Sequence, residues 1–328
     1  MKLIVNIPAY NEEAKIGETI KRIKASFSAD FYSNRETGAK ITEKLIQVVD
    51  DGSSDNTAKV AQEAGVDLLV SYKPNRRLAY AFKRAVENCL ENRADLMVNI
   101  DADGQFNPND IPLLLSPILL GQSDMVIANR FGEHEAKNMP KIKYQINRLG
   151  AAIVGYFLNY QIDDLTCGFR AHNRETLLRL NITNVSFTYT QETIIDAIGK
   201  NLKLQWVPVK VQYFADRKSR IVKSVWKFVS SSAKIILKAV RDVRPMKFFG
   251  IPGIIFIATS VLVFCLFLVQ YFQTFQITTY RNYLFLTAAL LFVGSQLVIF
   301  ALIADMIKTN RNLTEEQMYL QKKERYNN

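Results

Sequence analysis

Short apolar runs alternate with longer amphipathic segments along the first part of the chain. Apolar runs bounded by polar turns predict buried strands, and they lie at residues 2–7, 45–49, 66–71, 96–100 and 125–128. Between them the apolar residues recur at helical spacing, which predicts helices that include residues 16–27, 77–91, 110–120 and 141–160. Strands that alternate with helices are typical of a doubly wound α/β fold with a mostly parallel sheet.

A polar loop at residues 163–170 follows the last of these helices and leads into a short strand. A helix at residues 191–199 and a strand at 202–211 complete the expected globular domain, which covers residues 1–216. The apolar run at the start of the chain is too short for a signal peptide, so we expect this domain to be cytosolic.

Two long stretches free of Asp, Glu, Lys and Arg follow, at residues 251–272 and 283–304. Each has 22 residues, and a helix of this length, at about 1.5 Å per residue, spans the hydrocarbon core of a bilayer. We therefore expect a transmembrane hairpin over residues 249–306 and a charged tail over 307–328. Lys and Arg are frequent on both outer flanks, whereas the link carries only Arg281. The positive-inside rule then predicts an integral protein of the cell membrane with the globular domain and both termini in the cytoplasm.

The excess of positive charge, formally +11 over the whole chain, gathers beside these apolar stretches. Residues 217–247 hold ten Lys or Arg and one acidic residue, Asp242, with apolar residues at roughly helical spacing between them. A basic amphipathic segment of this kind suits anionic lipid headgroups, so we assign residues 217–248 to a juxtamembrane region. A surface helix packed on the domain is the alternative. Nucleic acid is not expected as a partner, because no aromatic stacking surface is interleaved with the charges.

Acidic residues follow three of the predicted strands. Asp101 and Asp103 come directly after the fourth one, and their i, i+2 spacing lets both side chains point the same way in an extended backbone. Two carboxylates there are suitable ligands for Mg or Mn, with phosphate supplying further oxygens. Gln105 continues the spacing and adds a neutral oxygen. A polar turn without a metal is the simpler interpretation of this segment alone, but the carboxyl ends of parallel strands share one edge, where the other acidic loops also fall.

Cysteine and histidine are scarce in this chain. Three cysteines lie far apart without a Cys-x-x-Cys pair, so neither a disulfide framework nor a zinc site is indicated, which fits a reducing compartment. The two histidines, His134 and His172, leave little room for histidine-based chemistry. A mostly parallel sheet with acidic loops, a metal-type acidic pair and a membrane anchor together predict a nucleotide-sugar transferase that acts on a lipid.

Residues 3 to about 220 resemble the family 2 glycosyltransferases, and among these the dolichyl- or polyprenyl-phosphate sugar synthases, some of which carry two C-terminal transmembrane helices. The resemblance rests on five segments in the right order: Ile7–Glu13, Val49–Asp55, Asp101–Gln105, Asn129–Phe131 and Gly168–Arg170. It implies a Rossmann-like GT-A nucleotide-sugar fold. It also implies an inverting, metal-dependent transfer of a hexose from a UDP- or GDP-sugar to polyprenyl or dolichyl phosphate.

The same resemblance implies a nucleotide site formed by Pro8, Tyr10, Asn11, Glu12, Asp50, Asp51 and Asp101. A carboxylate can accept the imino N–H of a uracil or guanine ring, which suits Glu12 or Asp51. Turn formation is the alternative for Asp50, and helix capping is the role that we expect of Asp55. For the cation the resemblance implies Asp101, Asp103 and Gln105, with Asp103 essential for catalysis.

Phosphate recognition needs cations, and Arg matches phosphate geometry better than Lys. The resemblance implies Arg130 and Arg148 for the acceptor phosphate, with Arg130 acting in catalysis, and Arg217, Ser219 and Arg220 near the donor diphosphate. An ordinary surface charge is the alternative for Arg148. Gln191 and Glu192 are candidates for the sugar hydroxyls, although a carboxylate at a helix N-terminus also explains Glu192.

The expected acceptor explains how the reaction proceeds without an enzymic base. A phosphate monoester has its second pKa near 6, so it is largely a dianion at cytosolic pH and can attack the anomeric carbon directly. One in-line displacement with inversion follows, driven by positioning and electrostatics. Many relatives carry a Gly-Lys-Gly run where this chain has Asn75-Arg76-Arg77, so we assign these three residues no role.

Three alternative functions stay open. A processive polysaccharide synthase is disfavoured because the chain lacks a Gln-x-x-Arg-Trp motif and further apolar stretches. A transferase that glycosylates a neutral lipid hydroxyl requires a base. A membrane-anchored protein that only binds nucleotide-sugars is disfavoured by the intact Asp-x-Asp. Besides the donor, the acceptor and membrane lipids, a homo-oligomer stays open as a partner.

Overall fold

The computed structural model of the chain describes residues 1–34, 40–131, 141–182, 189–211, 237, 241 and 243–327. Its contacts divide the chain into two compact units. The first is an α/β domain made of Met1–Ile236 together with Gln317–Asn328, and the second is a helical unit, Leu237–Glu316.

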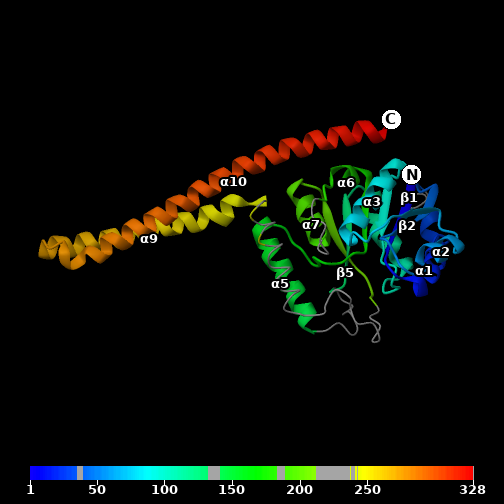
Figure 1. Cartoon of the computed structure of the whole chain (residues 1–328), viewed down its shortest axis with the longest axis horizontal. Coiled ribbons are helices and arrows are strands. Elements are labelled where there is room, and N and C mark those ends of the chain that lie inside the picture. The colour runs from blue at the N-terminus through cyan, green and yellow to red at the C-terminus, as the bar shows by residue number, and fades with distance from the viewer. Residues whose placement is uncertain are drawn as a thin grey trace. The chain divides into compact units, whose positions relative to one another are not determined.

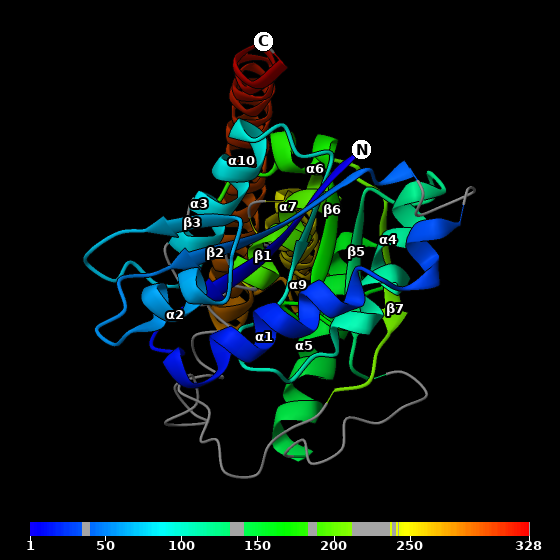
Figure 2. The same ribbon diagram turned by 90° about the vertical axis from the view of Figure 1, so that its right-hand side faces the viewer.

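In the described part of the chain, one seven-stranded sheet forms the centre of the α/β domain (Figure 1, Figure 2). Its strands are β1 Lys2–Ala9, β2 Glu43–Asp50, β3 Leu68–Ser71, β4 Leu96–Asn99, β5 Met125–Asn129, β6 Arg170–Asn173 and β7 Leu204–Pro208. They lie in the order β3-β2-β1-β4-β6-β5-β7, and all pairs are parallel except those of β6 with β4 and β5. The predicted mostly parallel α/β sheet is confirmed, and among the seven described strands β6 runs antiparallel to its neighbours.

Helices connect the strands much as the apolar spacing predicts. They are α1 Glu13–Ser26, α2 Thr57–Glu63, α3 Leu78–Glu91, α4 Ile111–Leu119, α5 Lys141–Leu158, α6 Arg174–Arg179 and α7 Tyr189–Gly199, with 3₁₀ turns η1 Asp30–Ser33 and η3 Pro108–Asp110. We did not predict α6, because a helix of fewer than two turns shows too little of the 3.6-residue period. The strand expected at residues 202–211 is confined to β7.

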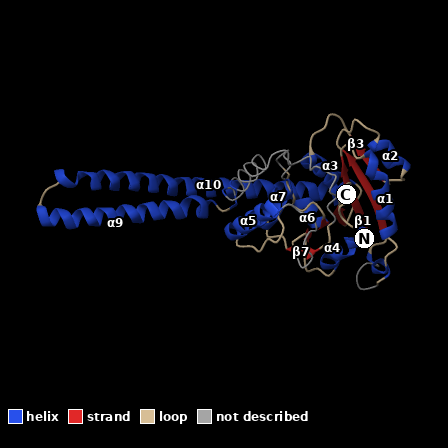
Figure 3. Cartoon of the chain, turned by 90° about the horizontal axis from the view of Figure 1, so that it is seen from below, coloured by secondary structure: helices blue, strands red, loops and turns tan. Residues whose placement is uncertain are grey.

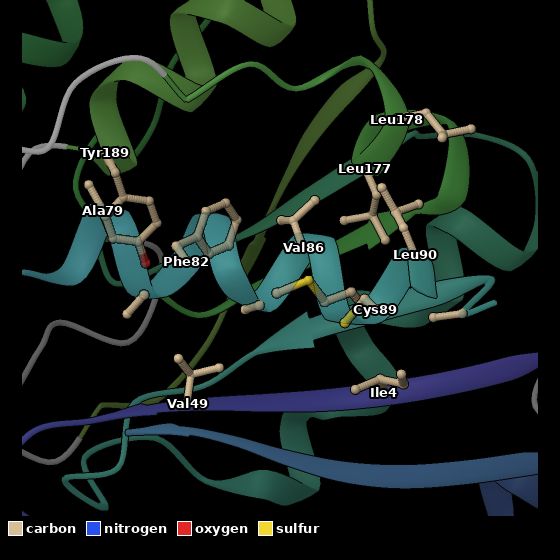
Figure 4. Close-up of a cluster of buried hydrophobic side chains, with 14 of the residues drawn as sticks. Ile4, Val49, Ala79, Phe82, Val86, Cys89, Leu90, Leu177, Leu178 and Tyr189 are labelled. Atoms are coloured by element: carbon tan, nitrogen blue, oxygen red, sulfur yellow. The ribbon is translucent and has the colours of Figure 1, made fainter. Parts of the chain in front are cut away.

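Helix α3 packs on one face of the sheet at the centre of a buried apolar cluster (Figure 4). Phe82 and Leu90 on α3 and Ile4 on β1 are buried in it. Leu177 of α6 and Tyr189 of α7 complete the cluster away from the sheet. Because burial of one such side chain stabilises a fold by about 1.5–3 kcal/mol, this cluster fixes α6 and α7 over α3.

Residues 317–327 belong to the same domain, although they follow both apolar stretches. Tyr319 is 7% exposed and joins the cluster on α3. Lys322 donates from Nζ to the main-chain oxygen of Leu180 at 3.0 Å and to Oδ1 of Asn181 at 2.9 Å. The last carbonyls of a helix lack intrahelical partners, so Lys322 satisfies the C-terminal end of α6. The segment that we expected as a charged tail thus ends packed on the α/β domain.

The second unit contains α9, Ile251–Thr274, and most of α10, Arg281–Asn327, joined by the 3₁₀ turn η5, Thr278–Tyr280. Among the described residues, these two helices are long and apolar enough to cross a membrane. The apolar stretches predicted at 251–272 and 283–304 fall inside them, and α10 continues far beyond the second stretch.

Small residues bring α9 and α10 together, and the two helices run side by side (Figure 3). A Cβ on Gly253 would lie 3.0 Å from the main-chain oxygen of Gly294. Ser260 Oγ donates to the main-chain oxygen of Thr287 at 2.9 Å. Close backbone approach at small residues and hydrogen bonds between helices are typical of packing inside membranes.

Most of the basic segment expected at residues 217–248 lies outside the described residues. Its amphipathic helix therefore stays a prediction.

Candidate active site

The candidate site lies at the carboxyl edge of β1, β2 and β4. Strand β1 pairs with β2 on one side and with β4 on the other, so the strand order changes direction between β1 and β4. Ligands of open α/β sheets bind outside the carboxyl ends of the strands at such a point. The main-chain N–H of Asn11, in the loop after β1, donates to Ser53 Oγ, in the loop after β2, at 2.9 Å, and Thr19 Oγ1 of α1 donates to the main-chain oxygen of Ala102, in the loop after β4, at 3.0 Å. The three acidic loops therefore form one rim.

Asp101 and Asp103 lie together on this rim, directly after β4. Desolvation by burial, together with the negative charges of Asp103 and Glu12, raises the pKa of Asp101 to about 7, and the positive charge of Arg130 opposes this shift. Two carboxylates that disfavour each other's ionised form would be stabilised by a shared cation.

The turn after β4 holds Asp103 in place. The main-chain N–H of Gln105 donates to Asp103 Oδ1 at 3.0 Å, and Lys15 Nζ donates to the main-chain oxygen of Asp103 at 3.2 Å. Gly104 adopts φ +72°, which glycine does at little cost. Among the described residues no group of three or more His, Cys, Asp and Glu side chains gathers around one point. Asp101 and Asp103 are thus a pair of carboxylates, and a carboxylate pair suits a hard divalent cation whose remaining ligands are oxygens of a bound molecule.

Gly168 forms a wall of the site beside Asp101. A Cβ added to Gly168 would lie 3.2 Å from Asp101 Oδ1 and 3.3 Å from Oδ2. Any other residue would therefore press on the carboxylate. The closeness of the Asp101 carboxylate explains why the first residue of the Gly168–Arg170 segment is a glycine.

The loop after β1 carries three of the predicted nucleotide residues, and a fourth, Pro8, lies at the end of β1 itself. Tyr10 is 41% exposed, and Glu12 is partly exposed beside it. Asn11 adopts φ +53°, and its Oδ1 accepts from the main-chain N–H of Ser54 at 2.8 Å. Pro8 is buried within β1. Tyr10 and Glu12 can meet a ligand directly, whereas Asn11 and Pro8 shape the loop.

Asp50 is occupied within the protein. Its Oδ1 accepts from the main-chain N–H of Ser53 at 3.1 Å, and its Oδ2 accepts from Ser71 Oγ at 2.9 Å. This geometry matches the turn-forming alternative for Asp50 better than a direct nucleotide contact. Asp55 Oδ1 accepts from the main-chain N–H of Thr57 at 3.0 Å. The N-cap of α2 is Asn56, without a side-chain capping bond, so the N-cap role expected of Asp55 is wrong: α2 begins one residue later, and Asp55 shapes the turn before the helix.

Asp51 is bound by the segment to which we assigned no role. Its Oδ1 accepts from the main-chain N–H of Arg76 at 2.8 Å, and its Oδ2 accepts from Asn75 Nδ2 at 2.8 Å. Gly52 permits this approach, because a Cβ there would lie 2.8 Å from the main-chain nitrogen of Asn75. Burial raises the pKa of Asp51, and the hydrogen bond from Arg76 opposes the shift. In the sequence, Asn75 and Arg76 are only part of a polar run before a helix, so their contact with Asp51 could not be predicted.

Arg130 follows β5 and is 7% exposed. Its Nε donates to Asp164 Oδ2 at 2.7 Å, and its Nη2 donates to Asp164 Oδ1 at 2.9 Å and to Thr166 Oγ1 at 2.7 Å. Asn147 of α5 also donates to Asp164 Oδ1, at 3.0 Å. The guanidinium thus holds the loop that leads to Gly168, while its charge lies close enough to oppose the raised pKa of Asp101.

The remaining phosphate candidates differ in what the structure shows. Arg148 is exposed on α5, and its Nη1 donates to Tyr144 Oη at 2.9 Å. Arg217, Ser219 and Arg220 lie outside the described residues.

The predicted sugar residues lie in the first turn of α7. Gln191 is 3% exposed, and its Oε1 has no hydrogen-bond partner among the described residues. Glu192 is partly exposed beside it. Arg170, which is fully buried, donates from Nη2 to the main-chain oxygen of Thr190 at 2.8 Å and from Nε to that of Cys167 at 2.6 Å. Arg170 thus joins α7 to the Gly168 loop.

Comparison with known proteins identifies the family and the fold of the chain. The chain is 28% identical over 227 residues to UDP-N-acetylglucosamine--dolichyl-phosphate N-acetylglucosaminyltransferase of Methanococcus voltae, across 63% of this chain and 84% of that protein. It is 29% identical over 212 residues to dolichol-phosphate mannosyltransferase of Pyrococcus furiosus, across 63% of this chain and 56% of that protein.

A solved structure shows the same fold. Glucosyl-3-phosphoglycerate synthase of Mycobacterium tuberculosis, crystallised with Mn²⁺, UDP-glucose and phosphoglyceric acid, superposes with a TM-score of 0.55 and 21% identity, over 74% of this chain and 79% of that one. The model of the family described as glycosyl transferase family 2 matches residues 4–180, more than half of the chain. The chain therefore belongs to glycosyl transferase family 2 and is a glycosyltransferase.

Proposed function

We propose that the chain transfers a sugar from a UDP- or GDP-sugar to a polyprenyl or dolichyl phosphate, with inversion at the anomeric carbon. The observation that carries the proposal is the acidic pair Asp101 and Asp103, which lies where the strand order of the sheet changes direction. The two relatives named above act, by their names, on dolichyl or dolichol phosphate.

A divalent cation, Mg or Mn, is held in this proposal by Asp101 and Asp103, with Gln105 as a further ligand. The fit rests on the place of the two carboxylates directly after β4, where burial and the charge of Asp103 disfavour the ionised form of Asp101. The mycobacterial enzyme of the same fold was crystallised with Mn²⁺ and UDP-glucose. When bound, such a cation stabilises the negative charge that builds up on a leaving nucleoside diphosphate.

The nucleotide lies in this proposal against the loops after β1 and β2. Tyr10 and Glu12 are exposed enough to contact the base, and Glu12 can accept an imino N–H. Asp51, in the loop after β2, acts through the loop after β3, since it fixes Asn75 and Arg76 there. Asn11, Pro8 and Asp50 support the loops from within.

The sugar lies between the acidic pair and α7. Gln191 Oε1 is a buried acceptor without a partner among the described residues, and a sugar hydroxyl would satisfy it. Because a buried polar atom without a partner costs about 1–3 kcal/mol, we assign Gln191 to the sugar. Glu192, one residue further, is the second candidate.

The acceptor phosphate needs positive charge close to the anomeric carbon. Arg148 is exposed and supplies one such charge, and Arg217, Ser219 and Arg220 are assigned to phosphate by resemblance. Arg130 contributes its charge from its place beside Asp164, and it positions the Gly168 loop. The dianionic phosphate attacks without an enzymic base.

The reaction is proposed to take place at the cytosolic face of the cell membrane. Helices α9 and α10 are long and apolar enough to cross a bilayer twice. Residues 317–327 pack on the α/β domain, so this C-terminal segment and the domain lie on the same side of the membrane. The Lys and Arg residues that flank the two apolar stretches favour the cytosolic side.

Incubation of the detergent-solubilised full chain with a panel of sugar nucleotides, Mn²⁺ and a polyprenyl phosphate tests this proposal. Mass spectrometry should detect a lipid phosphate that carries one sugar, from one donor only. If the sugar were found on a lipid hydroxyl or on a polysaccharide, the proposed polyprenyl phosphate acceptor would be wrong. Donor binding without any transfer or hydrolysis would support a protein that only binds nucleotide-sugars.

A further inference from the structure

A row of buried amides crosses the sheet one layer beneath the acidic pair. Gln47 of β2, Asn6 of β1 and Asn99 of β4 are paired in register on adjacent strands, and all three are fully buried. Asn88 of α3 joins the row at one end, and the main-chain oxygen of Gly168 ends it at the other. Central strands usually fill such positions with apolar side chains, so these amides need an explanation.

Every hydrogen bond of the row runs in the same direction. The row starts at Asn88 Nδ2, which donates to Gln47 Oε1 at 2.7 Å, and Gln47 Nε2 donates to Asn6 Oδ1 at 2.9 Å. Asn6 Nδ2 then donates to Asn99 Oδ1 at 2.7 Å, and Asn99 Nδ2 donates to the main-chain oxygen of Gly168 at 3.0 Å. Aligned hydrogen bonds strengthen one another, and a fully satisfied buried network is rigid. The row is therefore a rigid link between α3 and the Gly168 loop.

The end of the row at Gly168 lies against the acidic pair. The Cα of Gly168 faces the Asp101 carboxylate so closely that a Cβ would lie 3.2 Å from Oδ1. Asn99 also lies two residues before Asp101, on the same side of the extended chain. Arg170 holds the same loop through the main-chain oxygen of Cys167. Asn99 thus fixes the wall on which the Asp101 carboxylate rests.

We propose that Asn99 is a positioning residue for the divalent cation. Through its hydrogen bond to the main-chain oxygen of Gly168, it holds the Asp101 carboxylate in the orientation that binds the cation. This inference rests on the metal role given to Asp101 and Asp103 in the proposed function. Loss of a residue that orients a metal ligand typically lowers metal affinity about 10–100-fold.

The inference is tested by measuring Mn²⁺ binding to the purified full chain in the presence of UDP or GDP. Binding is followed as the loss of the electron paramagnetic resonance signal of free Mn²⁺. Asn99→Leu is compared with the matched control Asn88→Leu, which breaks the row at its far end. Both variants lose one amide and should melt at lower temperature. We expect Asn99→Leu to weaken Mn²⁺ binding about 10-fold and Asn88→Leu to change it less than about two-fold.

An unchanged Mn²⁺ affinity in Asn99→Leu overturns the positioning role. Equal weakening in both variants also overturns it, because general loosening of the core then explains the result. If wild type itself binds no Mn²⁺ with either nucleotide, the proposed metal site fails, and the positioning role fails with it.

Gly168→Ala provides the same test if Asn99→Leu does not fold. The new methyl group would lie 3.2 Å from Asp101 Oδ1, and Gly168 is not among the glycines with positive φ. Weaker Mn²⁺ binding by about 10-fold supports the inference, and unchanged binding overturns it.

Discussion

Arg130 and Asp164 form a buried ion pair at the end of β5, with Nε 2.7 Å from Oδ2. Asp164 also accepts from Asn147 and from the main-chain N–H of Thr166. Paired, both charges are satisfied, and the pKa of Asp164 lies below its ordinary value because Arg130 outweighs the cost of burial. The pair ties α5 and the Gly168 loop to the sheet.

Removal of one partner should leave the other charge buried and unpaired. We expect Asp164→Ala to lower the free energy of unfolding by about 3–5 kcal/mol, measured as a loss of thermal stability of the purified chain. The double variant Arg130→Met with Asp164→Leu should recover most of this stability, because no uncompensated charge is left. It should not recover transfer activity. Similar stability of Asp164→Ala and wild type would contradict the pairing.

Asp103→Ala should abolish nearly all transfer while the protein still folds. Asp103 is partly exposed on the rim, so its loss leaves no cavity in the core. The expected loss in rate is at least about 10²-fold, the effect of one lost electrostatic contact in a transition state. The measurement is product formation at saturating Mn²⁺, with thermal melting as the control for folding. Turnover close to wild type would count against a metal role for Asp103.

Tyr319 should anchor residues 317–327 to the α/β domain. Its ring is buried in the cluster on α3, the Arg179 guanidinium lies 4.1 Å from its centroid, and its hydroxyl donates to Glu175 Oε2 at 3.1 Å. We expect Tyr319→Ala to destabilise the domain by about 3–5 kcal/mol, as for other buried aromatic side chains. Tyr319→Phe loses only the hydrogen bond and should cost about 0.5–1.5 kcal/mol. Melting curves of both variants check whether Tyr319→Ala loses more stability than Tyr319→Phe. An equal loss of stability in the two variants would contradict the role of the buried ring as the anchor.

His172 should make the domain sensitive to acid. The ring is fully buried on β6, 5.7 Å from the Phe82 ring, and burial together with the charge of Arg170 lowers its pKa from 6.5 to about 3. Below pH 6.5, His172 therefore binds a proton in the unfolded chain but stays neutral in the folded chain. Stability is complete above pH 6.5 and falls by about 1.4 kcal/mol per pH unit as the pH drops toward 3.

The melting temperature at pH 7.5 and at pH 5 checks this prediction. His172→Leu, which cannot titrate, should show a smaller drop between the two values than wild type. An equal drop in the two proteins would assign the acid sensitivity to other groups.

The local pattern was enough to predict most of the sheet. The strands at the first five apolar runs are present because apolar runs between polar turns have few other ways to be buried. The same holds for the uncharged stretches 251–272 and 283–304, which lie within α9 and α10 and are long and apolar enough to cross a membrane. Pairing of β6 against its neighbours was not predictable, because direction is set by how a strand packs between β4 and β5.

For the site, the rim was predictable in part. Asp101 and Asp103 follow from their spacing after a strand. The ion pair between Arg130 and Asp164 and the hydrogen bond between Asn75 and Asp51 could not be predicted, because each joins residues that lie far apart in the chain. Such contacts depend on loop geometry, which side-chain chemistry alone does not fix.

The α/β class, the acidic rim and the apolar hairpin could thus be predicted from the amino-acid sequence, because they depend on periodicity, charge and length within single segments. Which polar residues serve the site and which serve the fold became clear from the packing of distant segments against one another. The amides Asn6, Gln47 and Asn99 look unremarkable in their strands, and they become one row only when β1, β2 and β4 are set in register. The physical reason is that a buried polar side chain is defined by its partner, and its partner lies on another strand.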